Sequence, residues 1–91
     1  MKKGEMLDKM LLLAVNAHHG QFDRGGAPYI LHTLKVMHYL RTDDEELMCI
    51  AIGHDVIEDT KTTYQELREI GISERVIKAI RALTKQPGQT L

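Results

Sequence analysis

Apolar residues recur along most of the chain at spacings of three and four, which is the period of an amphipathic α-helix. The first two stretches predict helices over residues 5–19 and 30–41, separated by a loop that begins at Gly20. On the first helix the predicted buried face consists of Met6, Met10, Leu13 and Ala17. On the second it consists of Ile30, Leu34, Val36, Met37, Leu40 and Arg41.

Capping residues predict three further helices. Thr42 with Glu45 three residues later matches a capping box and predicts a helix over 43–56. Thr63 with Glu66 repeats the pattern for a short helix over 63–69. Ser73 fits the N-cap of a fifth helix over 73–83. The predicted buried faces are Leu47, Ile50, Ala51 and His54 on the third helix, and Val76, Ile77, Ile80 and Leu83 on the fifth.

No segment shows the period-two alternation of a β-strand, so the predicted fold class is all-α. The absence of repeats, low-complexity tracts and charge blocks predicts a single domain over residues 1–91. Two loops stand out by their glycine and proline content, residues 20–28 and residues 85–91.

The composition narrows the functional classes. With 43% hydrophobic and 27% charged residues the chain has the composition of a soluble globular protein, and a net charge of -1 argues against nucleic-acid binding. The apolar run over 10–15 is too short to cross a membrane and has no signal-peptide pattern, so we expect a cytoplasmic protein without a membrane partner. A single cysteine, Cys49, excludes an intramolecular disulfide, and its apolar neighbours predict a buried, unreactive thiol.

The strongest chemical signal is a run of ionisable residues near the end of the third predicted helix. The pair His54-Asp55 is followed four residues later by the pair Glu58-Asp59. If the helix extends one more turn, Glu58 lies on the same face of the helix as His54, and Asp59 on the same face as Asp55. Neighbouring helical residues diverge by about 100°, so a further metal ligand must come from another element, and His32 is the natural donor. Two imidazoles and a carboxylate suit a first-row divalent ion such as manganese, iron or zinc.

Each of these signals also has a purely structural alternative. A single histidine on an apolar face, such as His54, is usually a core residue, and Glu58-Asp59 alone would fit a solvated turn. Four ionisable groups in six residues, directly after the apolar segment 50–53, would however be costly to bury without a balancing cation. The combination therefore favours a metal site.

The other histidines are expected to lie outside this site. His18 and His19 end the first predicted helix, where a solvated or capping role is favoured over catalysis. His38 lies six residues after His32 and is expected to point elsewhere, as a surface or packing residue.

Two long motifs resemble the RelA/SpoT-type family of HD-domain hydrolases. The segment 54–60, His-Asp-Val-Ile-Glu-Asp-Thr, resembles that family's HD signature. Residues 17–21, Ala-His-His-Gly-Gln, and 26–32, Gly-Ala-Pro-Tyr-Ile-Leu-His, resemble its first conserved block, and 82–85, Ala-Leu-Thr-Lys, resembles a later segment. The similarity runs from about residue 12 to residue 88. It implies an HD-domain helical bundle and the removal of pyrophosphate from the 3′ position of the alarmone ppGpp.

The resemblance also implies roles for individual residues. His32, His54 and Asp55 would be metal ligands, for manganese in particular, with iron, zinc or nickel as alternatives. Glu58 and Asp59 would act beside the metal-bound water. The metal would lower the pKa of that water and supply Lewis acidity. Tyr29 and Arg24 are the expected substrate-binding residues.

The chain departs from the family pattern in three places. Asp23-Arg24 stands where the family has Arg-Lys, which puts the preference for guanine in doubt because an acidic side chain cannot stack on the base as a cation. Thr33 stands where the family usually has proline. The chain stops at Leu91, before the Lys-Leu-Ala-Asp type segment that carries the family's fourth ligand. We therefore expect five helices of a longer domain whose C-terminal helices are missing.

These observations predict a metal-dependent phosphohydrolase acting on a nucleotide-like phosphate or pyrophosphate ester. A catalytically silent interaction module and an inactive metal-binding fragment remain as alternatives. Without further helices, apolar residues of the first and third helices would be uncovered, so we expect a homo-oligomer. The residues expected to be uncovered are Leu12, Leu13, Ile50 and Ile52.

Overall fold

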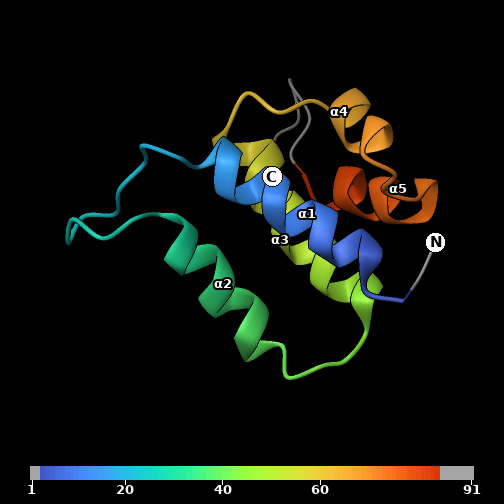
Figure 1. Cartoon of the computed structure of the whole chain (residues 1–91), viewed down its shortest axis with the longest axis horizontal. Coiled ribbons are helices and arrows are strands. Elements are labelled where there is room, and N and C mark those ends of the chain that lie inside the picture. Colours follow the sequence, from blue (N-terminus) through green and yellow to red (C-terminus); the bar gives the residue numbers. More distant parts are fainter. Residues whose placement is uncertain (1–2, 85–91) are drawn as a thin grey trace.

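Five α-helices make up the fold in the computed structural model, which describes residues 3–84 (Figure 1). They are α1 (Glu5–Ala17), α2 (Ile30–Tyr39), α3 (Glu45–Asp59), α4 (Tyr64–Glu69) and α5 (Glu74–Leu83). The predicted all-α class is confirmed, since the only extended pairing within 3–84 is an isolated bridge between Phe22 and Pro28. Lys85, which belonged to a family-like motif, and the predicted loop over 85–91 lie outside the described residues.

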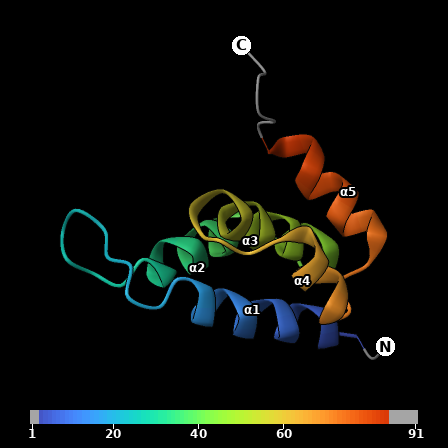
Figure 2. The same cartoon turned by 90° about the horizontal axis from the view of Figure 1, so that it is seen from above.

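Helix α3 is the centre of the molecule, because it contacts α1, α2 and α5 (Figure 2). Helix α4 contacts α5. The core between these helices is aliphatic and sulfur-containing, in a chain with only 4% aromatic residues. Its buried members are Met6, Met10, Ala14, Cys49, Ile52, Val56, Leu67, Ile72, Val76, Ile77 and Ile80.

Gly53 allows α1 and α5 to approach the same point of α3. This glycine is buried in the middle of the helix, where a β-carbon would collide with Ile80 of α5 and approach the Met10 methyl of α1 at 3.0 Å. Glycine costs a helix about 1 kcal/mol relative to alanine, so its presence here is explained by the close packing of three helices. The packing fixes the part of α3 that immediately precedes the candidate ligands His54 and Asp55.

The predicted buried face of α3 is wrong by two residue positions. The residues of α3 that are buried are Cys49, Ile52, Gly53 and Val56. Leu47 is 48% exposed, and Ile50, Ala51 and His54 are only partly buried. The third helix carries apolar residues on several sides because three other helices contact it, so periodicity alone could not select the face that is buried most deeply.

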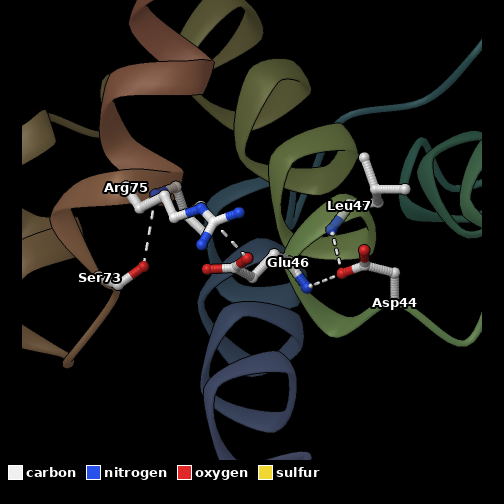
Figure 3. A network of polar contacts seen from close by, with 6 residues as sticks. Asp44, Glu46, Leu47, Ser73 and Arg75 are labelled. Carbon is white, nitrogen blue, oxygen red and sulfur yellow. Dashed lines mark hydrogen bonds and ion pairs between the residues drawn. The ribbon is translucent and has the colours of Figure 1, made fainter.

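The start of α3 also differs from the prediction. The N-cap is Asp44, whose carboxylate accepts hydrogen bonds from the backbone N–H groups of Glu46 and Leu47 (Figure 3). The hydroxyl of Thr42 instead accepts from the N–H of Asp44. Glu45 does not complete a capping box, because its carboxylate accepts from the backbone N–H of Leu7 at 3.0 Å. It therefore satisfies a free donor at the N-terminal end of α1.

The two other predicted caps are confirmed. The Thr63 hydroxyl accepts from the N–H of Glu66, and the Ser73 hydroxyl accepts from the N–H of Val76. Beside the second cap, Arg75 lies 3.5 Å from the Glu46 carboxylate, so an ion pair joins the first turns of α5 and α3 (Figure 3).

Most residues of helix α2 are exposed. It ends at Tyr39, two residues before the predicted end, and Arg41 adopts a left-handed backbone with φ of 49°. Only Thr33 of this helix is buried. Val36 and Leu40, which were predicted to be buried, are exposed, as are Leu31 and Tyr39. Among the helices over 3–84, none is long and apolar enough to cross a membrane.

The faces of α1 and α5 agree better with their predictions. Met6 and Met10 are buried on α1, although Ala14 replaces Leu13 as the third buried residue. On α5 the residues Val76, Ile77 and Ile80 are buried, whereas Leu83 is 60% exposed.

Of the residues expected to be uncovered, Leu12 is 65% exposed, while Leu13 and Ile50 are partly buried. Ile52 was wrongly included, because it is completely buried in the core.

Candidate functional site

Two hydrogen bonds join the N-terminal end of α2 to the C-terminal end of α3. The Tyr29 hydroxyl donates to Oδ2 of Asp59 at 3.0 Å, and the Thr33 hydroxyl donates to Oδ2 of Asp55 at 3.1 Å. Thr33 is only 2% exposed, and its bond to the partly exposed Asp55 is partly buried. We call the region formed by Tyr29, His32, Thr33, His54, Asp55, Glu58 and Asp59 the α2–α3 junction. It contains six of the seven residues that sequence reasoning singled out, all except Arg24.

Helix α3 continues for the extra turn that the sequence left open, because it ends at Asp59. His54 and Glu58 consequently lie one turn apart on the same side, with Nε2 of His54 at 3.3 Å from Oε1 of Glu58. The Thr60 hydroxyl and N–H both donate to the carbonyl of Val56, which ends the helix directly after the acidic pair.

His32 lies in the first turn of α2 and is exposed. Its ring centroid is 5.2 Å from that of Tyr29. Within residues 3–84, no three His, Cys, Asp or Glu side chains are grouped so that they could hold a metal ion. In these side-chain conformers Asp55 faces Thr33 and His54 faces Glu58, so the expected convergence of three donors is not present. The assignment of His32, His54 and Asp55 as ligands stays a prediction.

The donor types still fit a divalent ion. Two imidazoles and a carboxylate are ligands that first-row metals accept, and the Thr33–Asp55 bond brings the backbone beside His32 next to the helix that carries the other two donors. The elements that carry the donors are therefore adjacent even though the side chains do not form a cluster.

The environment of Tyr29 keeps its phenol protonated. Burial, the hydrogen bond to Asp59 and the negative charges of Asp55, Asp59 and Glu58 raise the pKa of Tyr29 from 10.0 to about 12. Burial is the largest of these causes. At neutral pH the Tyr29 hydroxyl is consequently a hydrogen-bond donor to the Asp59 carboxylate.

A buried histidine lies beside the junction, and sequence reasoning had placed it in solvent or in a capping role. His18 follows the last residue of α1 but is only 2% exposed. Its Nδ1 is 2.9 Å from Oε1 of Gln21, and its ring centroid is 5.0 Å from that of Tyr29. The amide nitrogen of Gln21 donates in turn to the backbone carbonyl of Asp59 at 2.9 Å. Local sequence gives no signal for this burial, because it depends on the contacts of His18 with Gln21 and Tyr29.

The predictions for the other two histidines hold. His19 and His38 are both exposed, and neither belongs to the junction.

Asp23, which departs from the family pattern, has a structural role in the loop between α1 and α2. The Asp23 carboxylate accepts hydrogen bonds from the backbone N–H groups of Gly25 and Ala27, at 2.9 and 3.0 Å. The backbone of Asp23 is paired with Ala27 as well. Asp23 thus fixes the tip of a loop that extends away from the helices (Figures 1 and 2). Arg24, the other predicted substrate-binding residue, is exposed on this loop.

A hollow of about 660 Å³ opens beside the end of α3. Its lining is mostly polar and includes Glu58, Asp59 and Gln21, together with Lys61. A neighbouring groove of about 590 Å³ between α1 and α4 is more apolar and includes Leu12 and Ile70 in its lining. The predicted catalytic carboxylates therefore line the hollow, whereas the predicted metal ligands are not part of its lining.

Cys49 has the properties predicted for it. The side chain is fully buried in the core, and burial raises the pKa of the thiol from 9.0 to about 12, with further contributions from the charges of Glu45 and Glu46. A thiol that remains protonated is a poor nucleophile, so Cys49 is a packing residue.

Comparison with known proteins agrees with the resemblance that the motifs predicted. No family model matches the chain. The guanosine-3′,5′-bis(diphosphate) 3′-pyrophosphohydrolase of Aquifex aeolicus is 37% identical over 83 residues, which covers 89% of this chain and 12% of that protein. The bifunctional (p)ppGpp synthase/hydrolase SpoT of Escherichia coli is 42% identical over 67 residues, 70% of this chain and 9% of that protein. The GTP pyrophosphokinase rsh of Brucella melitensis is 37% identical over 83 residues, 88% of this chain and 11% of that protein.

These similarities confirm the resemblance to RelA/SpoT-type proteins. The chain spans only about a tenth of the length of these relatives.

Proposed function

We propose that this relative of the RelA/SpoT-type proteins is a metal-dependent phosphohydrolase that removes pyrophosphate from the 3′ position of a (p)ppGpp-like nucleotide. The observation that carries the proposal is the similarity of 89% of the chain to a protein named as a guanosine-3′,5′-bis(diphosphate) 3′-pyrophosphohydrolase. The geometry of the α2–α3 junction supports it, since the histidine- and carboxylate-bearing ends of two helices are held together there by hydrogen bonds.

In this proposal His32, His54 and Asp55 hold one divalent ion, with manganese as the first candidate. When bound, such an ion supplies Lewis acidity to a phosphoryl oxygen and makes water a stronger acid. The hydrogen bond from the Thr33 hydroxyl occupies one acceptor site of the Asp55 carboxylate, so it would orient this carboxylate and leave its other lone pairs for the ion.

The two carboxylates of the junction would have different tasks. Asp59 is held on both sides, since Tyr29 donates to its carboxylate and Gln21 donates to its carbonyl. Glu58 is exposed, and its carboxylate contacts His54 alone among the contacts described for this end of α3. We assign proton transfer to Glu58, whose carboxylate is open to the hollow beside α3, and orientation of the substrate or water to Asp59.

Substrate binding is assigned to Tyr29 and Arg24. The Tyr29 hydroxyl is already engaged with Asp59, so a nucleotide would contact its ring. Arg24 offers an exposed guanidinium on the loop that Asp23 fixes, which suits a phosphate or a base.

A catalytically silent interaction module is the second candidate. It is favoured by the internal pairing of His54 with Glu58 and of Asp55 with Thr33, which satisfies these side chains without a ligand. The exposed apolar residues of α2, namely Leu31, Val36, Tyr39 and Leu40, would then serve a protein partner.

Hydrolysis of ppGpp by the whole chain distinguishes the two candidates. The purified protein is incubated with ppGpp and Mn²⁺, and the release of pyrophosphate and GDP is followed by chromatography. The enzyme proposal expects both products, their loss in His54→Ala, and wild-type rates in His38→Ala, which removes an exposed histidine of α2 outside the junction. No product with Mn²⁺, Fe²⁺, Zn²⁺ or Ni²⁺ would reject the enzyme and leave the interaction module.

A further inference from the structure

The orientation of the Gln21 side chain is fixed by the two groups that it contacts. Its amide nitrogen is 2.9 Å from the backbone carbonyl of Asp59, and a carbonyl oxygen can only accept a hydrogen bond. The NH₂ group of Gln21 must therefore face Asp59. The amide oxygen then faces Nδ1 of His18 at 2.9 Å, and an amide oxygen also can only accept. Nδ1 of His18 must consequently carry a proton.

This constraint makes the other ring nitrogen of His18 a buried acceptor without a hydrogen-bond partner within residues 3–84. A neutral imidazole has one N–H group, so protonation of Nδ1 makes Nε2 an acceptor. Nε2 is buried and has no hydrogen-bond partner among the described residues. An unpaired buried polar atom destabilises the folded state, so a core histidine kept only for its volume would be an unfavourable choice at this position. The function of His18 is more reasonably found at its paired nitrogen.

The chain of contacts from His18 ends at one particular peptide group. The carbonyl that Gln21 holds belongs to Asp59, the last residue of α3, and such a carbonyl has no partner within its helix. The same peptide unit contains the N–H of Thr60, which donates to Val56. Because a peptide unit is planar, fixing the Asp59 carbonyl also fixes this N–H and the position of the Asp59 α-carbon, from which the side chain extends.

The ring of His18 supports the same residue by a second route. It packs against the ring of Tyr29 at a tilt of 42°, with ring centroids 5.0 Å apart, and Tyr29 donates to the Asp59 carboxylate. The backbone and the side chain of Asp59 are therefore both held by residues that contact His18.

We propose that His18, held as the Nδ1–H tautomer, is a positioning residue that fixes the end of α3 through Gln21 and Tyr29 and so orients Asp59. It does not touch the reacting groups itself. A contribution to turnover rests on the proposed function, whereas the tautomer and the ordering of α3 do not.

Three variants separate the hydrogen bond from the packing. His18→Phe keeps an aromatic ring against Tyr29 and removes the donor. His18→Asn restores a donor near the position of Nδ1. Gln21→Met removes the link to Asp59 at a partly exposed position, where misfolding is not expected, and Gln65→Met is its control on the exposed side of α4.

Two NMR measurements test the proposal without any need for catalysis. Nitrogen-15 spectra of the wild-type chain at neutral pH should show His18 with a protonated Nδ1 and an unprotonated Nε2. Hydrogen exchange of the Thr60 amide should be about tenfold faster in His18→Phe and Gln21→Met, and close to wild type in His18→Asn and Gln65→Met. The amide of Ile77 in α5, which is bonded to Ser73, reports global stability and should exchange at the wild-type rate in Gln21→Met.

A wild-type ring protonated on Nε2 alone, or an unchanged Thr60 exchange rate in Gln21→Met, would overturn the proposal. If the chain hydrolyses ppGpp, His18→Phe should lower kcat with KM unchanged, and His18→Asn should restore it. A chain without hydrolase activity would refute the proposed function, and the exchange rates would still decide the role of His18.

Discussion

The phenol of Tyr29 donates a hydrogen bond to the carboxylate of Asp59 at 3.0 Å, although the two residues are 30 positions apart in the sequence. This bond connects the residue that precedes α2 to the last residue of α3. It defines where the loop between α1 and α2 meets the acidic pair, and it holds two motifs that are distant in the chain next to each other.

Removal of this bond should have a small effect on stability. Tyr29→Phe keeps the ring contacts with His18 and His32 and loses only the hydroxyl, so we expect the free energy of unfolding to fall by about 0.5–1 kcal/mol, the lower range for a partly exposed hydrogen bond. Urea denaturation followed by circular dichroism measures the change. Tyr39→Phe alters an exposed tyrosine of α2 and should leave the midpoint unchanged.

The same variant should change the response to alkaline pH. The pKa of Tyr29 is raised in the folded chain from 10.0 to about 12, so folding favours the protonated phenol. This contribution to stability is complete below pH 10 and disappears as the pH rises through 12. Between these values the wild type should lose more stability than Tyr29→Phe, and equal losses in the two proteins would contradict the assigned environment.

Glu58→Gln should separate proton transfer from metal binding. The substitution keeps the size of the side chain and removes the carboxylate that would accept a proton, so hydrolysis of ppGpp should slow by about 10²–10⁴-fold. Bound manganese should remain at the wild-type level. Glu69→Gln, an exposed residue of α4, is the matched control, and a Glu58→Gln protein with normal turnover would remove Glu58 from the mechanism.

Because of the hydrogen bonds that Glu45 accepts, the folded chain should be less stable at acidic pH. Its carboxylate accepts from the N–H of Leu7, and hydrogen bonds from the backbone of Leu7, Gly4 and Met6 lower its pKa below 4.5 in the folded chain. The stabilisation is therefore present above pH 4.5 and is lost as the pH falls through the lower folded value. In thermal unfolding at pH 7, Glu45→Gln should melt below the wild type, and the difference should shrink at pH 3. Asp43→Asn should have no such effect.

The predicted self-association can now be assigned to specific residues. Leu12 is 65% exposed at the apolar groove between α1 and α4, whereas Ile52 is buried and cannot contribute. We expect dimers or larger species by light scattering at low micromolar concentration, and a shift towards the monomer in Leu12→Lys. Lys9→Ala, which changes a polar residue lining the same groove, is the control. A monomeric wild type would contradict this prediction.

The sequence predicted the helices well because their signals are local. Thr63 and Ser73 cap the helices that follow them, and the apolar spacing of α1 and α5 identifies most of their buried residues. The errors occur where a residue forms a hydrogen bond with a distant part of the chain in place of the predicted local one. Glu45 binds the backbone of Leu7, 38 positions away, and Asp44 takes over the cap that was assigned to Thr42.

In the candidate site, too, the sequence predicted contacts within one helix but not contacts between separate segments. The spacing of His54 and Glu58 is a property of one helix, and the structure places these side chains 3.3 Å apart. The burial of His18 depends on contacts with Gln21 and Tyr29, which follow it in a loop whose path the local sequence does not determine. The contacts of Thr33 with Asp55 and of Tyr29 with Asp59 join separate helices, so no periodicity could reveal them.

Binding of Mn²⁺ to the purified chain, measured by isothermal titration calorimetry in the absence of nucleotide, tests the central claim that the α2–α3 junction is a metal site. The account predicts one ion per chain for the wild type and for His38→Ala, and at least a hundredfold weaker binding for His54→Ala and for Asp55→Asn. Binding of the same strength in all four proteins, or no binding to the wild type, would contradict it.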